Sequence, residues 1–281
     1  MRKLKLTFKR LLTSKLAVLG LVICTIVMLV AIFVPLIQTH DPLETDVPAK
    51  LSPPSKEHWF GTDELGRDLF SRIISGTRIT VIVGIVAVLI ALVLGIILGI
   101  LAGYYGGWFD TLISGFIDTI WAFPTIILAL AITTALGSGL FNVLLAIGIV
   151  FTPSFARIVR STVLTVRETE YVQGARAIGL NDFEIIMRYI LPNTFSIIIV
   201  QTSLNAAQAI LTEASLSFMG LGLSAENASW GAMLRGGFSF MTRGAYWLSI
   251  IPGIAIMITV LGLNFLGDGL RDALDVRLRM E

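Results

Sequence analysis

Long apolar runs separated by short polar segments dominate the pattern of this chain. A helix needs about 20 apolar residues to cross the hydrocarbon core of a bilayer, and runs of that size recur. The apolar/polar alternation of a membrane β-barrel is absent. The pattern therefore predicts an all-α polytopic membrane protein with six membrane-spanning helices. We expect four of them at Leu16–Gln38, Ile79–Phe109, about Thr194–Ser215 and about Tyr246–Leu266.

The other two spans share the uncharged stretch Thr119–Ala156, which the turn-like Gly137-Ser138-Gly139 interrupts. This stretch is too long for one span and slightly short for two plus a turn. The third span should therefore begin near Thr111 and include Asp118. Pro124 should kink it, because proline removes a helical hydrogen bond.

Composition supports a membrane location. Hydrophobic residues make up 55% of the chain and charged residues only 14%, with a mean hydropathy of +0.85. A typical soluble domain carries about a quarter charged residues. The first apolar run is too long for a usual signal-peptide core, so we interpret it as a retained span. The net charge of +2 does not indicate a nucleic-acid partner.

The sequence lacks the usual marks of an enzyme. It contains no Gly-Lys pair, so it has no phosphate-binding loop with its lysine. The single cysteine, Cys24, excludes a disulfide within the chain. His40 and His58 are not at metal-ligand spacing. We predict no catalytic residue, no metal site and no bound cofactor in this chain.

The distribution of basic residues predicts the orientation. Of the 21 lysines and arginines, 14 fall on the side of the termini and of the loop after the fourth span, and 7 fall on the other side. Cytoplasmic loops of membrane proteins carry the excess of Lys and Arg. Both termini and this loop are therefore expected in the cytoplasm.

That loop, Glu170–Asn193, should form a helix–glycine–helix elbow. Gly179 is placed to end the first helix in a left-handed conformation. Asn181 and Glu184 form a box-like start of a second helix. Pro192 should end or kink that helix. Helical spacing predicts an exposed apolar stripe on the first helix, formed by Tyr171, Val172, Ala175 and Ile178.

The elbow resembles the loop that import-type ABC transporter permeases insert into their ATP-binding subunits. The family pattern is an E-A-A triplet, a glycine three to four residues later, and a closing I-x-L-P. The triplet matches loosely here, with small residues and a nearby acid. The alternative is an ordinary amphipathic connector between two spans. The positions that carry the resemblance are Glu170, Gly174, Ala175, Ala177, Gly179, Ile190, Leu191 and Pro192.

A second motif lies in the loop Thr39–Thr77. It resembles the H-x-F-G-T-D-x-x-G-R-D signature of the peptide/nickel branch of this family, in the subunit with an extra N-terminal helix. We expect its two glycines to supply turns, and its charged residues Asp63, Arg67 and Asp68 to pair with each other. The motif either packs the loop onto the membrane surface or docks a binding protein. Its residues are His58, Phe60, Gly61, Thr62, Asp63, Gly66, Arg67 and Asp68.

These resemblances imply a type I ABC importer permease fold in the cytoplasmic membrane. Residues 1–77 would form the N-terminal tail, the first span and the outer loop. Residues 78–268 would form the five-helix transmembrane domain, with a coupling elbow at about 168–193, and 269–281 a cytoplasmic tail. The implied partners are a second homologous permease, two ATP-binding subunits that hold ATP and Mg, an external solute-binding protein and membrane lipid. The implied solute is a dipeptide or oligopeptide, or alternatively nickel or another small solute.

Two acidic residues, Asp118 and Glu213, lie within apolar runs, where a charge is costly. Each is either a pathway or proton site, or a paired residue that stabilises helix packing, and we favour the second interpretation. The first would suit a secondary transporter driven by an ion gradient, which is the main rival function. A scaffold without transport is a third. Glycines in the second span, Gly84, Gly95, Gly99 and Gly103, predict close helix approach, with a partner subunit as one candidate for the neighbouring helix.

Overall fold

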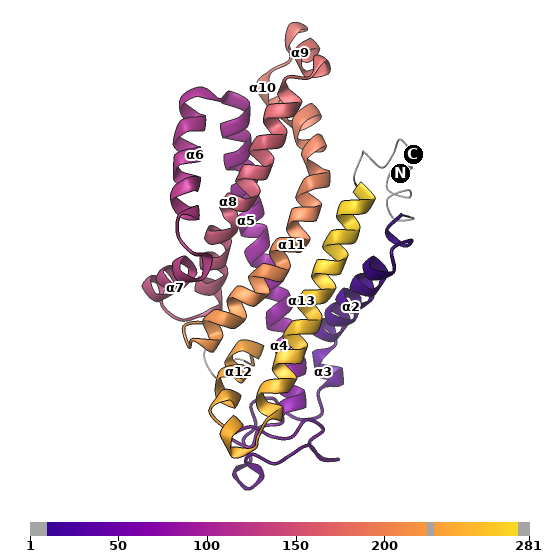
Figure 1. Cartoon of the computed structure of the whole chain (residues 1–281), viewed down its shortest axis with the longest axis vertical. Coiled ribbons are helices and arrows are strands. Elements are labelled where there is room, and N and C mark those ends of the chain that lie inside the picture. The colour runs from indigo at the N-terminus through magenta and orange to yellow at the C-terminus, as the bar shows by residue number, and fades with distance from the viewer. Residues whose placement is uncertain (1–9, 224–227, 275–281) are drawn as a thin grey trace.

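A computed structural model describes residues 10–223 and 228–274 (Figure 1). Within these ranges the chain is helical and has no strand, apart from an isolated bridge between Thr62 and Asp68. Five helices are long and apolar enough to cross a membrane, or six if one bent pair counts as a single span. The predicted all-α fold is confirmed. Six basic residues used for the orientation lie outside the described residues: Arg2, Lys3, Lys5, Lys9, Arg277 and Arg279.

The first half of the chain supplies three of these long elements. The first is α2 (Lys15–Ile32), which the short α3 (Val34–Ile37) follows. A continuous helix then runs from Leu69 to Tyr105. Its segments are α4 (Leu69–Ile82), the π-helical η2 (Val83–Ala87), α5 (Val88–Ile100) and the π-helical η3 (Leu101–Tyr105). The helices α6 (Gly107–Trp121) and α7 (Thr125–Leu136) follow, and α8 (Leu140–Arg167) is the third long element.

The second half begins with the two short helices α9 (Glu170–Ala177) and α10 (Asp182–Ile185). The π-helical η4 (Ile186–Ile190) joins α10 to α11 (Leu191–Phe218). The remaining elements are α12 (Trp230–Phe238), the 3₁₀ turn η5 (Met241–Arg243) and α13 (Trp247–Leu274); a further 3₁₀ turn, η1 (Val47–Ala49), lies in the loop before α4.

Two predicted boundaries fall inside helices. The second span begins at Leu69 rather than Ile79, so the division at 77/78 cuts α4, and α13 continues past 268 to Leu274. Arg72 and Arg78 made the start of α4 look too polar for a span. Arg72 is nevertheless buried, with Nε 3.5 Å from Asp63 of the preceding loop. A loop carboxylate therefore lets this helix carry a charge.

The third span is broken, whereas the sequence predicted a kink. The helices α6 and α7 meet at 94°. Pro124 precedes α7 with φ −55° and ψ 129°, so it leaves the helical region and starts a new helix. Its ring also disfavours a helical conformation for Phe123. The chain therefore turns sharply at this proline.

The continuous helix that contains α5 packs closely on α8, and three glycines of the second span, Gly95, Gly99 and Gly103, lie at this contact, whereas Gly84 lies against Ile210 of α11. A Cβ at Gly99 would lie 2.7 Å from the carbonyl oxygen of Ala156, and one at Gly103 would lie 2.9 Å from Cβ of Val163. Gly95 faces Phe155 in the same way. The predicted close helix approach is therefore confirmed for these three glycines, and the neighbouring helix belongs to this chain.

We expect Gly99→Ala to lower the stability of the purified protein by about 1–3 kcal/mol, because the added methyl group overpacks the α5–α8 contact. Gly115→Ala is the matched control, since Gly115 is also helical and a Cβ there meets nothing within 4 Å. Thermal denaturation of both variants in the same detergent measures the effect. Equal midpoints for the two would contradict the packing.

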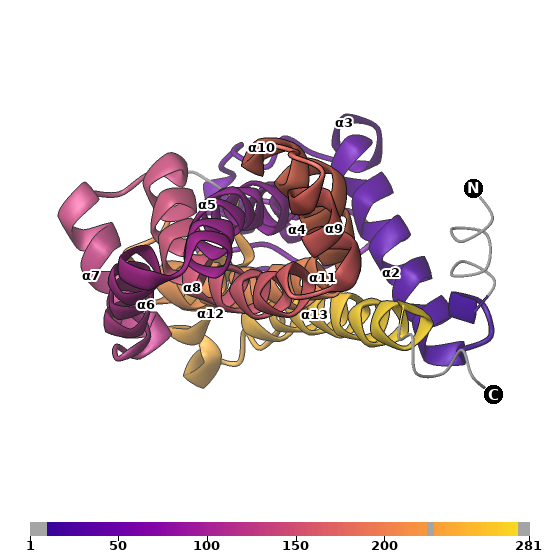
Figure 2. The same cartoon turned by 90° about the horizontal axis from the view of Figure 1, so that it is seen from above.

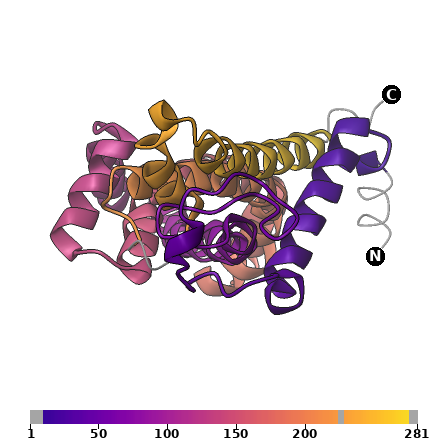
Figure 3. The ribbon, with the colours of Figure 1, turned by 90° about the horizontal axis from the view of Figure 1, so that it is seen from below.

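The molecule has two distinct ends along its long axis. The helices α9 and α10 lie at one end, towards which the first residues of α2 and the last of α13 also point (Figures 1 and 2). The loop between α3 and α4 lies at the other end, beside α12 (Figure 3). We call residues 39–68 the outer loop and residues 168–193 the elbow.

Candidate functional site

The elbow is built from local signals that the sequence carries. The helix α9 ends in a Schellman motif, in which Leu180 N donates to Ala175 O and Gly179 N donates to Arg176 O. Gly179 has φ +84°, a left-handed conformation that glycine adopts without strain. Asn181 and Glu184 then form a capping box at the start of α10. The predicted helix–glycine–helix arrangement is confirmed.

The predicted apolar stripe on α9 was only half right. Tyr171 and Ile178 are exposed, but Val172 and Ala175 are buried in a cluster with side chains of η3 and α8. The prediction treated the four side chains as one exposed stripe, but η3 and α8 pack against one side of α9 and bury two of them. The surface apolar side chains at the tip are instead Ile178, 79% exposed, and Phe183, 72% exposed.

Pro192 does not end the second helix of the elbow. The chain stays helical from Asp182 to Phe218. The irregularity appears one turn earlier, as the π-helical turn Ile186–Ile190. A π-turn is one way to accommodate a proline that lacks its N–H and crowds the preceding turn. The elbow therefore continues into α11 without a break.

The elbow is tied to the helices beneath it. Tyr104 donates a hydrogen bond to Oδ1 of Asp182 at 2.7 Å, and Arg167, the last residue of α8 before the elbow, donates to the carbonyl of Gly103 at 2.8 Å. Ile185 and Ile190 are fully buried. Sequence reasoning missed Tyr104 and Asp182, since they lie 78 positions apart. Through these contacts the elbow and the spans should move together.

The other predicted elbow positions are on its surface. Glu170, Gly174, Ala177 and Pro192 are exposed, Leu191 is half-buried, and a Cβ at Gly174 would meet nothing within 4 Å. Exposed apolar side chains beside charged and small residues suit docking to another protein.

The outer loop contains a buried ionic cluster. Arg67 Nε lies 2.6 Å from Asp63 Oδ2, and Arg72 approaches the same carboxylate. Oδ1 of Asp63 also accepts from the backbone of Leu65 and Arg67. The predicted Asp63–Arg67 pair is confirmed. Asp68, expected in the same group, lies instead beside His58, with 3.0 Å between Oδ1 and Nδ1.

The glycines of the outer-loop motif have the expected role. Gly61 and Gly66 adopt φ +77° and +79°. A Cβ at Gly61 would lie 2.6 Å from the carbonyl oxygen of Ser52. A Cβ at Gly66 would collide with the carbonyl oxygen of Asp46. Phe60 packs edge-on against Phe70, and the Thr62 hydroxyl donates to the carbonyl of Ala49. The motif therefore folds the outer loop onto itself.

Both acidic residues in the apolar runs have polar neighbours. Asp118 is exposed and pairs with Arg157 at 2.8 Å, while Arg157 also stacks on Trp121. Glu213 is 2% exposed and accepts a hydrogen bond of 2.6 Å from the hydroxyl of Ser217. The Asp118–Arg157 pair links α6 to α8, whereas Ser217 lies in the same helix as Glu213. A stronger ion pair, Arg160–Asp110, joins α8 to α6 through two hydrogen bonds and was not predicted.

Comparisons with known families agree with this geometry. Residues 95–280 match the family described as "Binding-protein-dependent transport system inner membrane component". Residues 3–54 match the "N-terminal TM domain of oligopeptide transport permease C". The chain belongs to the family of binding-protein-dependent inner membrane permeases. Such permeases work with ATP-binding and substrate-binding partners.

Individual relatives cover nearly the whole chain. It is 48% identical over 272 residues to the dipeptide transport system permease protein DppC of Alkalihalophilus pseudofirmus, which covers 97% of this chain and 89% of that protein. It is 43% identical over 262 residues to the probable D,D-dipeptide transport system permease protein DdpC of Escherichia coli K12, with 93% and 88% covered.

Solved structures show the same fold. The methionine ABC transporter MetNI, in an inward-facing conformation, matches with a TM-score of 0.57 at 17% identity. The match covers 73% of this chain and 96% of that chain. The fold is that of a type I ABC importer permease.

Proposed function

We propose that this chain is a membrane-spanning permease subunit of an ATP-driven importer for dipeptides or oligopeptides. The relatives named as dipeptide permeases support the solute class. The elbow carries the mechanism, because its apolar tip is exposed while its base is anchored to the helices. The elbow can transmit a movement to the membrane helices only if its base is fixed to them and its tip is accessible to a partner.

The elbow is the part that an ATP-binding subunit would grip. ATP and Mg would be bound by two such subunits in the cytoplasm, on the side that the basic residues favour. Their closure would pull on the elbow and rotate the spans between inward-open and outward-open arrangements. A second homologous permease would complete the pathway, and an external binding protein would deliver the peptide to the outer-loop end. This chain would bind no nucleotide and catalyse no reaction.

Reconstitution of the chain with its partners into proteoliposomes tests this proposal. We expect uptake of a labelled dipeptide to require both ATP and the binding protein. Uptake by this chain alone, driven by an ion gradient, would instead identify a secondary transporter. If the dipeptide is not taken up but another solute is taken up in an ATP-dependent way, only the proposed solute class is overturned.

Contact at the elbow is tested separately. Cys24 is the only cysteine of the chain and lies in α2, far along the chain from the elbow. Ile178→Cys, in a Cys24→Ser background, should form a cross-link with the ATP-binding subunit. Ser55→Cys in the outer loop is the control and should form none. Cross-linking at Ser55 but not at Ile178 would reverse the proposed orientation.

A further inference from the structure

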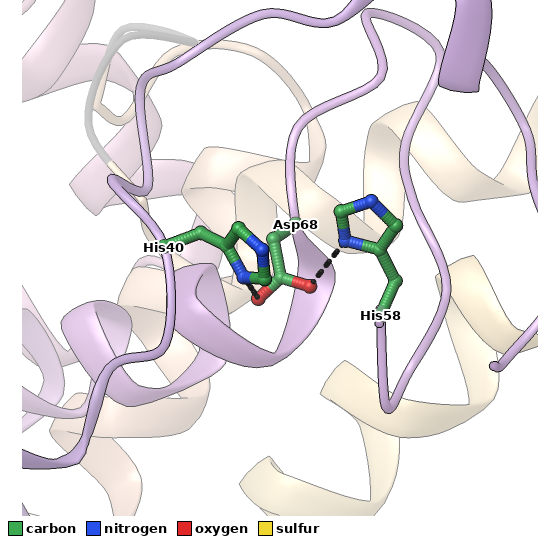
Figure 4. A group of neighbouring side chains, drawn as sticks. All are labelled: His40, His58 and Asp68. Carbon is green, nitrogen blue, oxygen red and sulfur yellow. Dashed lines mark hydrogen bonds and ion pairs between the residues drawn. The ribbon is translucent and has the colours of Figure 1, made fainter. Parts of the chain in front are cut away.

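Three potential metal ligands meet in the outer loop although the sequence keeps them apart. One ring nitrogen of His40, one ring nitrogen of His58 and a carboxylate oxygen of Asp68 all lie within 4.8 Å of one another (Figure 4). Spacing along the chain did not indicate this group, because the residues come from the segment after α3, the middle of the loop and the start of α4. Folding of the outer loop brings them together. We propose that they bind a zinc ion that fastens the outer loop to α4.

The distances are close to those of a tetrahedral zinc site. Zinc binds imidazole nitrogen at about 2.0–2.1 Å and carboxylate oxygen at about 2.0–2.2 Å, so neighbouring ligand atoms lie about 3.3 Å apart. The His58–Asp68 separation is 3.0 Å, and Nδ1 of His40 lies 3.9 Å from Oδ2 of Asp68. The two imidazoles approach different oxygens of the Asp68 carboxylate, so these side chains would shift when one ion binds all three.

The carboxylate is held in place by a second hydrogen bond. Asp68 has a side chain that is 1% exposed, and its Oδ2 accepts from the backbone N–H of Ser71 at 2.8 Å. Oδ1 is therefore directed towards His58. The hydroxyl of Ser71 in turn accepts from the backbone N–H of His40 at 3.0 Å. Such outer contacts orient metal ligands before the ion arrives.

The donor set selects the class of metal. Two imidazoles and one carboxylate suit zinc, whereas Mg²⁺ and Ca²⁺ prefer oxygen ligands alone. The side chain of His40 is 34% exposed, which gives an ion access from water and leaves room for a water molecule as the fourth ligand. Nδ1 of His40 also lies 3.0 Å from the hydroxyl of Thr39, a hydrogen bond that coordination would replace.

Binding here would join three separate parts of the chain. The ion would connect the segment after α3, the middle of the outer loop and the N-terminus of α4. It would stabilise the folded outer loop in proportion to the logarithm of free zinc over its dissociation constant. The competing explanation is that the three side chains form only a hydrogen-bonded group.

Metal content of the complete transporter decides between these explanations. The complex is purified without a histidine tag, treated with a chelator and equilibrated with zinc chloride. We expect the wild type to bind about one zinc ion more per complex than His58→Asn, measured by elemental analysis. The loss of zinc affinity in His58→Asn should exceed the roughly 10–100-fold loss that follows removal of a residue that only hydrogen-bonds to a metal ligand. Glu57→Gln, at the neighbouring position, should bind as the wild type does.

Three further measurements separate binding from folding. Asparagine at position 58 can still donate to Asp68 but is a poor zinc ligand, so His58→Asn should have the wild-type thermal midpoint in chelator. Zinc should slow proteolysis of the outer loop in the wild type and leave the variant unchanged. Cobalt chloride should give the visible absorption of a tetrahedral site in the wild type alone. Equal zinc content in wild type, His58→Asn and His40→Asn would overturn the proposal.

Discussion

Replacing Gly179 with valine is expected to abolish transport while the protein still reaches the membrane. Gly179 has φ +84°, and a left-handed conformation costs a residue with a side chain roughly 1–2 kcal/mol. A β-branched residue is the least tolerant, because its Cβ carries two heavy atoms. To relieve the strain the Schellman turn must open, and α10 then leaves its position relative to α9. Uptake in reconstituted vesicles and the amount of protein in the membrane measure the two effects.

Controls at and near the same position isolate the backbone effect. A Cβ at Gly179 meets nothing within 4 Å, so space within the chain is not the obstacle. Asparagine tolerates the left-handed region, and Gly179→Asn should keep a substantial part of the activity. Gly174→Ala lies in a helical part of the elbow and should be nearly normal. Normal uptake by Gly179→Val would count against the elbow as a coupling element.

The second large effect is expected from Asp63→Ala in the outer loop. Its carboxylate lies beside two buried guanidinium groups, those of Arg67 and Arg72. Removing one partner of a buried ionic group typically costs about 3–5 kcal/mol, and here two guanidinium groups would lose the same carboxylate. The backbone N–H groups of Leu65 and Arg67 also lose their acceptor. We expect the outer loop to open, with a lower thermal midpoint and rapid proteolysis between α3 and α4.

Glu64→Ala provides the comparison for this effect. Glu64 lies 3.7 Å from Arg67 but its side chain is 34% exposed, so water screens the pair. Its loss should change the midpoint little. Asp63→Asn should fall between the two, because the amide oxygen still accepts from the backbone. If Asp63→Ala and Glu64→Ala were equally stable, the buried cluster would not hold the loop.

The turn of the elbow could be predicted from local sequence signals, whereas its contacts with the rest of the chain could not. Gly179, Asn181 and Glu184 act within a few residues, so their roles follow from the sequence. The burial of Val172 depends on η3 and α8, which approach from distant parts of the chain. The Tyr104–Asp182 hydrogen bond has the same origin.

The outer loop shows the same division. Its charges and glycines indicated a compact fold, and the Asp63–Arg67 pair is four residues apart. The pairing of Asp68 with His58 rather than with Arg67 depends on how the loop returns to α4. The two histidines looked unrelated for this reason.

By itself, the sequence determined that this protein lies in a membrane, how many spans it has to within one broken helix, and where the elbow turns. These features depend on apolar length and short-range backbone preferences, which are properties of neighbouring residues. Only the tertiary structure decided which glycines lie between which helices, which side of the elbow is buried, and that His40, His58 and Asp68 meet. Those outcomes depend on the packing of segments far apart in the chain, for which no local pattern carries information.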